Sequence, residues 1–259
     1  MIGWLHELPL GWLVVTVFAA TYLVAAVIGW AVVTLAVGER AKAFTGVSSG
    51  MLPPMGLLFG LLVGFVAAQV WTGVDRAQVA VDREASALRA TVLVAAAFPG
   101  APDESIRALV DRYIRDAVDR EWPAMAHGSA TLSLPPAPLT QGLQLALGLD
   151  PQSEGQKVAQ REMVTSLENA LDARRQRIIL SESTVNWVKW TGVILVGLLT
   201  LLTIAFVHSA NRRTAAIAMG LFATAMATSL VLIASQDRPF SGHLAIKPDV
   251  LLQVEPNPK

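Results

Sequence analysis

Apolar and polar positions are separated along this chain into long blocks. Four runs, residues 10–38, 51–74, 190–208 and 214–236, are predominantly apolar and carry no Asp, Glu, Lys or Arg. A helix needs about 20 apolar residues to cross a bilayer core of roughly 30 Å, and each run is near or above that length. The pattern predicts an all-α membrane protein with four transmembrane helices paired in two hairpins.

A polar stretch of ordinary charge content separates the two predicted hairpins. The first apolar run is too long for the hydrophobic region of a signal peptide, and no Lys or Arg precedes it, so we expect it to be retained. The expected organisation is a leader (1–9), a first hairpin (10–74), a helical extramembrane insert (75–186), a second hairpin (187–236) and a C-terminal tail (237–259).

Apolar residues in the insert recur every three or four positions, which predicts helices. The first helix continues the second span and ends at Pro99, a typical helix-stopping residue. A second begins with Asp103 as its N-cap and ends at Pro123. Residues 132–138 hold three prolines and predict an irregular connector, and a third helix covers about 155–185.

One charged side chain of the third insert helix falls on the apolar side of that helix. Arg174 lies between Leu171 and Ile178 along this side. Its aliphatic stem could cover apolar surface while the guanidinium reaches water. Alternatively the arginine is partly buried and pairs with Glu84 or Asp82 on the facing helix, because an unpaired buried charge is costly.

Small residues repeat every four positions in two of the spans. Such residues let helix backbones approach closely in lipid, either within one chain or between copies. The predicted packing positions are Gly56, Gly60 and Gly64 in the second span and Ala216, Gly220 and Thr224 in the fourth.

A second stripe of the second span consists of larger apolar residues, Phe59, Val63, Val66 and Val70. These side chains could face lipid or the protein core. In an oligomer they could also form a narrow apolar constriction, since pores can close by dewetting at such rings. We take them as the candidate constriction.

Composition narrows the classes of function. Hydrophobic residues make up 53% and charged residues 15% of the chain, and 20 basic residues balance 20 acidic ones. The low charge content argues against a soluble enzyme, and the zero net charge gives no basis for nucleic-acid binding. The sequence has no cysteine, and its four histidines lack metal-ligand spacing. We therefore expect no enzyme activity, no catalytic residue, no metal and no cofactor.

Basic residues in the short loops suggest an orientation. Arg40 and Lys42 follow the first span, and Arg212 and Arg213 follow the third, so the positive-inside rule places these loops in the cytoplasm and the insert outside. Most tryptophans lie at the insert ends of the spans, as expected for the headgroup level. Trp30 lies inside the first run and does not fit this belt.

Several segments together resemble the bacterial bestrophin-like family, also labelled a domain of unknown function. They are VWTGVDRAQVAVDREASAL (70–88), EWPAMAHG (121–128), LDARRQRI (171–178) and DRPFSG (237–242), and the resemblance covers about 57–250. The family-motif residues in these segments are Glu84, Glu121, Trp122, Pro123, Arg174, Arg177, Asp237, Pro239, Phe240 and Gly242.

The resemblance implies a function that the residues alone do not reveal. Bestrophins are pentameric anion channels whose second membrane helix lines the pore. By analogy this chain is expected to form a homo-oligomer, a pentamer, in the inner (plasma) membrane and to pass chloride or another small anion. Bestrophins hold their helical domain in the cytoplasm, opposite to the orientation given by the loop charges. The alternative is a membrane-anchored interaction or sensory module that does not conduct ions.

Overall fold

A computed structural model describes residues 9–36, 44, 49–133, 135–242 and 244–254. Residues 1–8, Arg40, Lys42 and the last five residues lie outside the described part, so the leader and half of the loop-charge pattern cannot be placed. The described residues form helices and no strands, which confirms the all-α prediction. Four helices are long and apolar enough to span a membrane: α1 (Leu10–Leu35), α3 (Leu52–Ala95), α8 (Trp187–Val207) and α9 (Arg212–Ala234).

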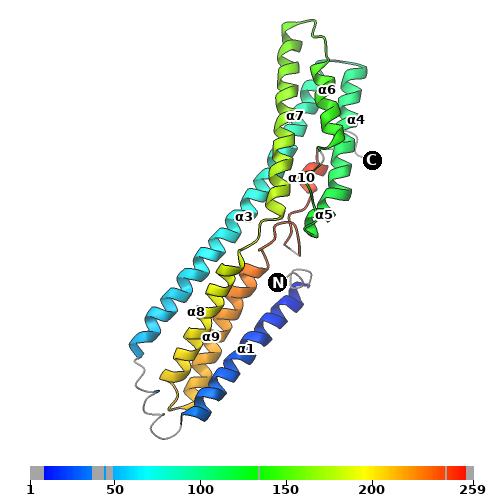
Figure 1. The fold of residues 1–259 in the computed structure, drawn as a ribbon. Helices are drawn as coiled ribbons and strands as arrows, with labels where there is room; N and C mark the ends of the chain where they lie inside the picture. Colours follow the sequence, from blue (N-terminus) through cyan, green and yellow to red (C-terminus); the bar gives the residue numbers. More distant parts are fainter. Residues whose placement is uncertain (1–8, 37–43, 45–48, 134, 243, 255–259) are drawn as a thin grey trace. The chain divides into compact units, whose positions relative to one another are not determined.

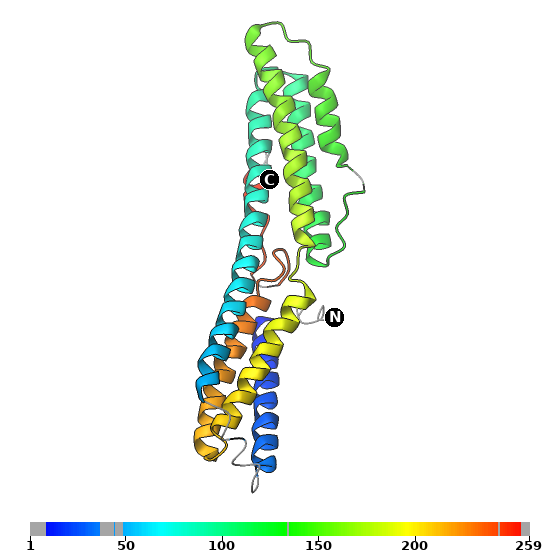
Figure 2. The same cartoon turned by 60° about the vertical axis from the view of Figure 1, so that its left-hand side comes forward.

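The chain divides into two units, and α3 contributes to both. The membrane unit contains residues 1–72 and 184–237, and its helices α1, α8, α9 and the first part of α3 lie side by side (Figures 1 and 2). One face of α1 is turned inward, with Leu13, Ala25 and Val32 buried. The membrane-unit parts of these helices are apolar on almost every side. Which side chains are buried is therefore decided by the neighbouring helices and not by the polarity of the residues.

Side-chain caps mark where the second pair of spans begins. The Asn186 side chain accepts a hydrogen bond from the backbone N–H of Val188 at the start of α8, at 3.0 Å. Asn211 does the same for α9, accepting from Arg213 at 3.1 Å. The buried Asp237 carboxylate accepts from the N–H of Val185 at 2.7 Å. These bonds satisfy donors that a helix start leaves free.

The tightest glycine contact in the membrane unit occurs on α8. A Cβ placed on Gly197 would lie 2.7 Å from Cε of Met226 on α9 and 3.3 Å from the Phe59 ring on α3. Gly197 is not part of a repeat of small residues, because Val193 and Leu201 lie four positions before and after it. The helices α3, α8 and α9 therefore approach one another closely at Gly197.

We expect Gly197→Val to destabilise the membrane unit by about 1–3 kcal/mol, the usual cost of overpacking a core. Gly192→Val in the same helix is the matched control, since nothing lies within 4 Å of its added Cβ and both changes have the same effect on helix propensity. Thermal unfolding in detergent micelles, followed by circular dichroism, compares the two. Equal midpoints would show that Gly197 is not a packing position.

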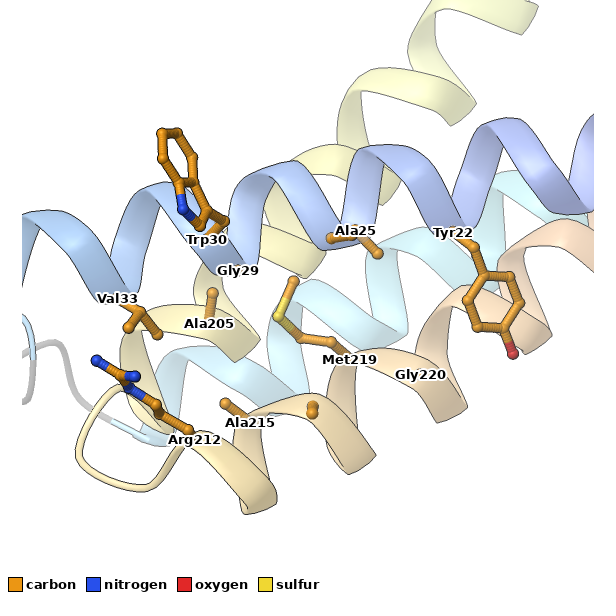
Figure 3. Close-up of a pocket in the computed structure, with 12 residues that line it drawn as sticks. Tyr22, Ala25, Gly29, Trp30, Val33, Ala205, Arg212, Ala215, Met219 and Gly220 are labelled. Carbon is orange, nitrogen blue, oxygen red and sulfur yellow. The ribbon is translucent and has the colours of Figure 1, made fainter.

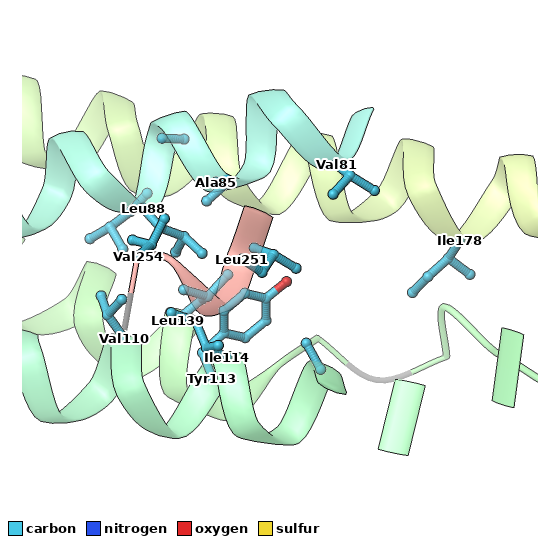
Figure 4. Packing of buried hydrophobic residues seen from close by; sticks show 14 of the residues in the cluster. Val81, Ala85, Leu88, Val110, Tyr113, Ile114, Leu139, Ile178, Leu251 and Val254 are labelled. Atoms are coloured by element: carbon cyan, nitrogen blue, oxygen red, sulfur yellow. The ribbon is translucent and has the colours of Figure 1, made fainter. Parts of the chain in front are cut away.

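The helical unit contains residues 73–183 and 238–259. Its helices besides the rest of α3 are α4 (Ala101–Asp116), the π-helix η3 (Ala117–Glu121), α5 (Trp122–Ala126), α6 (Ala137–Leu147), α7 (Glu154–Ser181) and α10 (Asp249–Leu252). Figure 4 shows its apolar core, in which Leu88 of α3, Ile114 of α4, Leu139 of α6 and Leu251 of α10 gather around Tyr113.

Three predictions for the insert helices were wrong. The α4 helix begins at Ala101 after Gly100, whose φ of 88° favours glycine, so Asp103 lies in the first turn and is not the N-cap. Helix continues past Pro123, because a proline at the start of α5 needs no N–H donor. The predicted connector 132–138 runs into helix α6, which begins at Ala137 and lacks the polar cap that would have signalled it.

Candidate functional site

The helical unit contains a buried cluster of charged side chains. Arg177 of α7 is fully buried, and so is Glu84 of α3. The Arg177 guanidinium donates from Nε to Glu84 Oε2 at 2.7 Å and from Nη2 to Glu84 Oε1 at 3.0 Å. The same Nη2 donates to Glu121 Oε2 at 2.8 Å. This bidentate arrangement is the strongest geometry available to an arginine and a carboxylate.

Arg174, one turn before Arg177 on α7, completes the cluster. Its Nη2 lies 2.6 Å from Glu121 Oε1, and its side chain is 9% exposed. The interpretation of Arg174 as an arginine reaching water is therefore wrong. The partly buried, paired alternative is right about burial but wrong about the partner, because Arg177 occupies Glu84 while Glu121 reaches α7 from η3. Two arginines and two glutamates leave the cluster without net charge.

Tyr113 of α4 closes the cluster on the side of Glu84. Its hydroxyl donates a hydrogen bond to the Glu84 carboxylate. Burial and, after it, the charge of Glu84 raise the pKa of Tyr113 well above the usual value, so the phenol stays protonated and remains a donor. Burial alone would lower the pKa of Arg177, but the charge of Glu84 and the other neighbours raise it overall. Arg177 therefore stays charged.

An aromatic layer covers the remaining face of Arg177. The guanidinium carbon lies 4.6 Å from the ring centre of Trp122, a cation–π contact. The Trp122 indole N–H donates to the carbonyl of Ile246 at 3.0 Å, and its ring meets Phe240 edge-on at 5.8 Å. The chain after the last span is thus attached to the cluster.

The remaining family-motif residues occupy positions around this layer. Pro123 lies in the first turn of α5, Pro239 accepts a backbone hydrogen bond from Ile246 at 2.8 Å, and Gly242 adopts a φ of 83° that favours glycine. Asp237 lies in the membrane unit, where it caps the segment before α8. Motif residues as far apart in sequence as Glu84 and Phe240 therefore meet mainly at one place.

The arrangement is that of a stabilising element. The Glu84 carboxylate is engaged by Arg177 and Tyr113, and Arg177 is engaged on all three of its nitrogens, with Nη1 donating to the sulfur of Met125 at 3.4 Å. No polar atom of these groups is left free for a ligand. Among the described residues, no group of three or more His, Asp or Glu side chains could hold a metal ion.

The structure places the predicted constriction away from any open surface. Phe59, Val66 and Val70 are buried in the core of the membrane unit, and Val63 is half-buried beside them. The Phe59 ring packs against Phe222 of α9 with their centres 5.1 Å apart. These side chains are used by packing within the chain, so a path for ions is expected along another face of α3.

The opposite face of α3 is open. Positions two residues earlier, Leu57, Leu61, Gly64 and Ala68, are rotated by about 200° around the helix, and all four are exposed. Leu57 is 64% and Leu61 48% exposed. The sequence could not separate these two faces, because both are apolar and only the neighbours distinguish them.

The predicted glycine contacts are not found among the described residues either. A Cβ placed on Gly56, Gly60 or Gly64 would meet nothing within 4 Å. The same holds for Gly220 in α9. The hydroxyl of Thr224 in α9, by contrast, shares a 2.6 Å hydrogen bond with the hydroxyl of Tyr22 in α1. Contacts among the described residues therefore do not explain why these positions are glycine.

A comparison with known families gives one match. The sequence matches the family described as Bestrophin-like domain over residues 19–251. This match covers all four spans in whole or in large part and the whole charged cluster. Searches of curated proteins and of solved structures gave no match.

We expect Glu84→Gln to destabilise the helical unit by about 3–5 kcal/mol, because it leaves Arg177 buried with half its neutralising charge. Glu154→Gln is the matched control: Glu154 pairs with Lys157 at the surface and is 87% exposed, so its loss should cost less than about 1 kcal/mol. The midpoint of thermal unfolding in detergent, followed by circular dichroism, measures both.

A second change separates charge from packing in this prediction. Adding Arg177→Met to Glu84→Gln should recover part of the lost stability, since the buried cation disappears while an apolar chain of similar volume remains. Equal midpoints for Glu84→Gln and Glu154→Gln, or a further loss in the double variant, would contradict the assigned role of the ion pair.

Proposed function

This chain belongs to the bestrophin-like family of membrane proteins, and from that premise we propose that it forms a homo-oligomeric channel for small anions such as chloride. The inner (plasma) membrane is the proposed location. The observation that supports conduction most is the open face of α3. Leu57, Leu61, Gly64 and Ala68 form a continuous exposed surface on the second span, which no other helix in the described part of the chain covers.

An oligomer gives this face a role. Repetition of α3 around a symmetry axis would turn the face toward a shared path, and each copy would present the same residues. Leu57 and Leu61 are larger than Gly64 and Ala68, so such a path would be narrowest at the two leucines. The narrowest ring would therefore be apolar. A ring of this kind controls ions by dewetting, without any charged group in the span.

One basic side chain beside the apolar part of α3 supports a preference for anions. Residues 52–74 carry no charge, so discrimination has to arise at the entrances. Lys189 at the start of α8 donates a hydrogen bond to Gln69, which is itself exposed on α3. A fixed ammonium group next to the end of the pore helix attracts anions and repels cations.

We expect Leu61→Cys to make chloride flux sensitive to a negatively charged methanethiosulfonate reagent. The chain has no cysteine of its own, so the reagent modifies only the introduced thiol, and only where water reaches it. Efflux of chloride from liposomes, with and without the reagent, gives the readout. Flux should fall toward that of protein-free liposomes, because a charged adduct would occupy the narrowest ring.

Two matched variants test the assignment of the face. Val66→Cys lies on the buried face of the same helix, and Leu221→Cys on α9 is 69% exposed toward lipid; neither should respond. A response at Val66 but not at Leu61 would instead show that the stripe of Phe59, Val63, Val66 and Val70 lines the path. A folded oligomer that passes no chloride, or a protein that crosslinks only as a monomer or dimer, would favour a non-conducting anchored module.

A further inference from the structure

A groove lies in the membrane unit between α1 and α9. Its volume is about 360 Å³, within the usual range for sites that hold small organic molecules. Figure 3 shows Tyr22, Ala25, Gly29 and Val33 of α1 along one side, with α9 opposite. The groove is partly open to the surroundings and almost entirely apolar.

Missing side-chain bulk creates this groove. Seven of its twelve lining residues are alanine or glycine. Met219 of α9 reaches across to α1, where its sulfur lies 3.4 Å from the position of a Cβ on Gly29. At Gly220 nothing lies within 4 Å of an added Cβ, so space remains at this position although α1 and α9 pack against each other at Gly29 and Met219.

The two ends of the groove differ in polarity. Toward the insert side the Tyr22 and Thr224 hydroxyls satisfy each other at 2.6 Å. At the other end stands Arg212, the first residue of α9, whose side chain rises toward Val33 in Figure 3. Among the described residues, no acidic side chain pairs with Arg212.

Arg212 lies at the end of an apolar span, where lipid headgroups are expected. The spans α8 and α9 meet in the short turn between Val207 and Arg212, so the arginine lies where the apolar segment ends. Trp30 of α1, 71% exposed, also lines the groove. Because α1 ends at Leu35, Trp30 lies less than two turns from its end, which explains the tryptophan that did not fit the belt predicted at the insert side.

We propose that this groove binds one anionic phospholipid, with an acyl chain between α1 and α9 and the phosphate on Arg212. An apolar groove open to a bilayer is filled by lipid chains, and a guanidinium matches a phosphate in geometry and charge. The Tyr22 and Thr224 hydroxyls carry no charge and bond each other. Arg212 is therefore the group in the groove that would select an anionic headgroup. The proposal does not depend on whether the chain conducts ions.

The experiment measures lipid retained by the full-length protein after extraction from liposomes of phosphatidylcholine and phosphatidylglycerol in equal amounts. Native mass spectrometry counts the lipids that remain bound. The wild-type protein should retain phosphatidylglycerol in preference to phosphatidylcholine. Arg212→Gln should lower that preference about fivefold, as expected for the loss of one cation beside an anionic lipid. Gly220→Leu, which fills the groove, should lower the retention of both lipids.

Two control variants make the outcome specific. Arg213→Gln removes the neighbouring arginine, which does not line the groove, and Gly192→Leu adds the same side chain at an open position of α8. Both should behave as the wild type. The proposal is overturned if Arg212→Gln and Arg213→Gln act equally, if Gly220→Leu retains lipid normally, or if Gly220→Cys forms a disulfide between copies, because a protein surface would then occupy the groove.

Discussion

A guanidinium that has no contact with water must be neutralised where it lies, and this constraint organises the helical unit. Arg177 of α7 is held by Glu84 of α3 and Glu121 of η3, and Trp122 covers its face. Each partner comes from a different element, so the helices have to assemble together for any of them to be satisfied. The penalty for an unpaired buried charge thereby fixes one arrangement of these elements.

The membrane unit is specified by a different kind of contact. Its helices are apolar on every side, and lipid provides no hydrophobic force between them, so shape decides which faces meet. Phe59 and Met226 fit against the missing side chain of Gly197, and this fit turns Leu57 and Leu61 outward. Where small residues are not filled in this way, between α1 and α9, a groove remains.

These two kinds of contact suggest separate roles for the units. The Glu84 carboxylate and the Arg177 guanidinium have no free polar atom, and the cluster is suited to hold the helical unit rigid, while the membrane unit presents exposed surfaces. Proposed conduction and proposed lipid binding both use those surfaces. They lie on different helices, α3 for the path and α1 with α9 for the lipid, so each can fail without the other.

The sequence by itself determined the number of spans, the all-α class and the segments that carry the family motif, because apolar run length and helical periodicity are local properties. It also placed Arg174 on the packed side of its helix. Only the tertiary structure decided that Arg174 meets Glu121, that Arg177 meets Glu84, and that Phe59, Val66 and Val70 face the core. Two faces of a membrane helix that are both apolar cannot be told apart by residue type, so the sequence does not say which one is packed. Nor does it say which arginine a carboxylate pairs with, because that depends on which elements the fold brings together. Contacts between distant segments settle both questions.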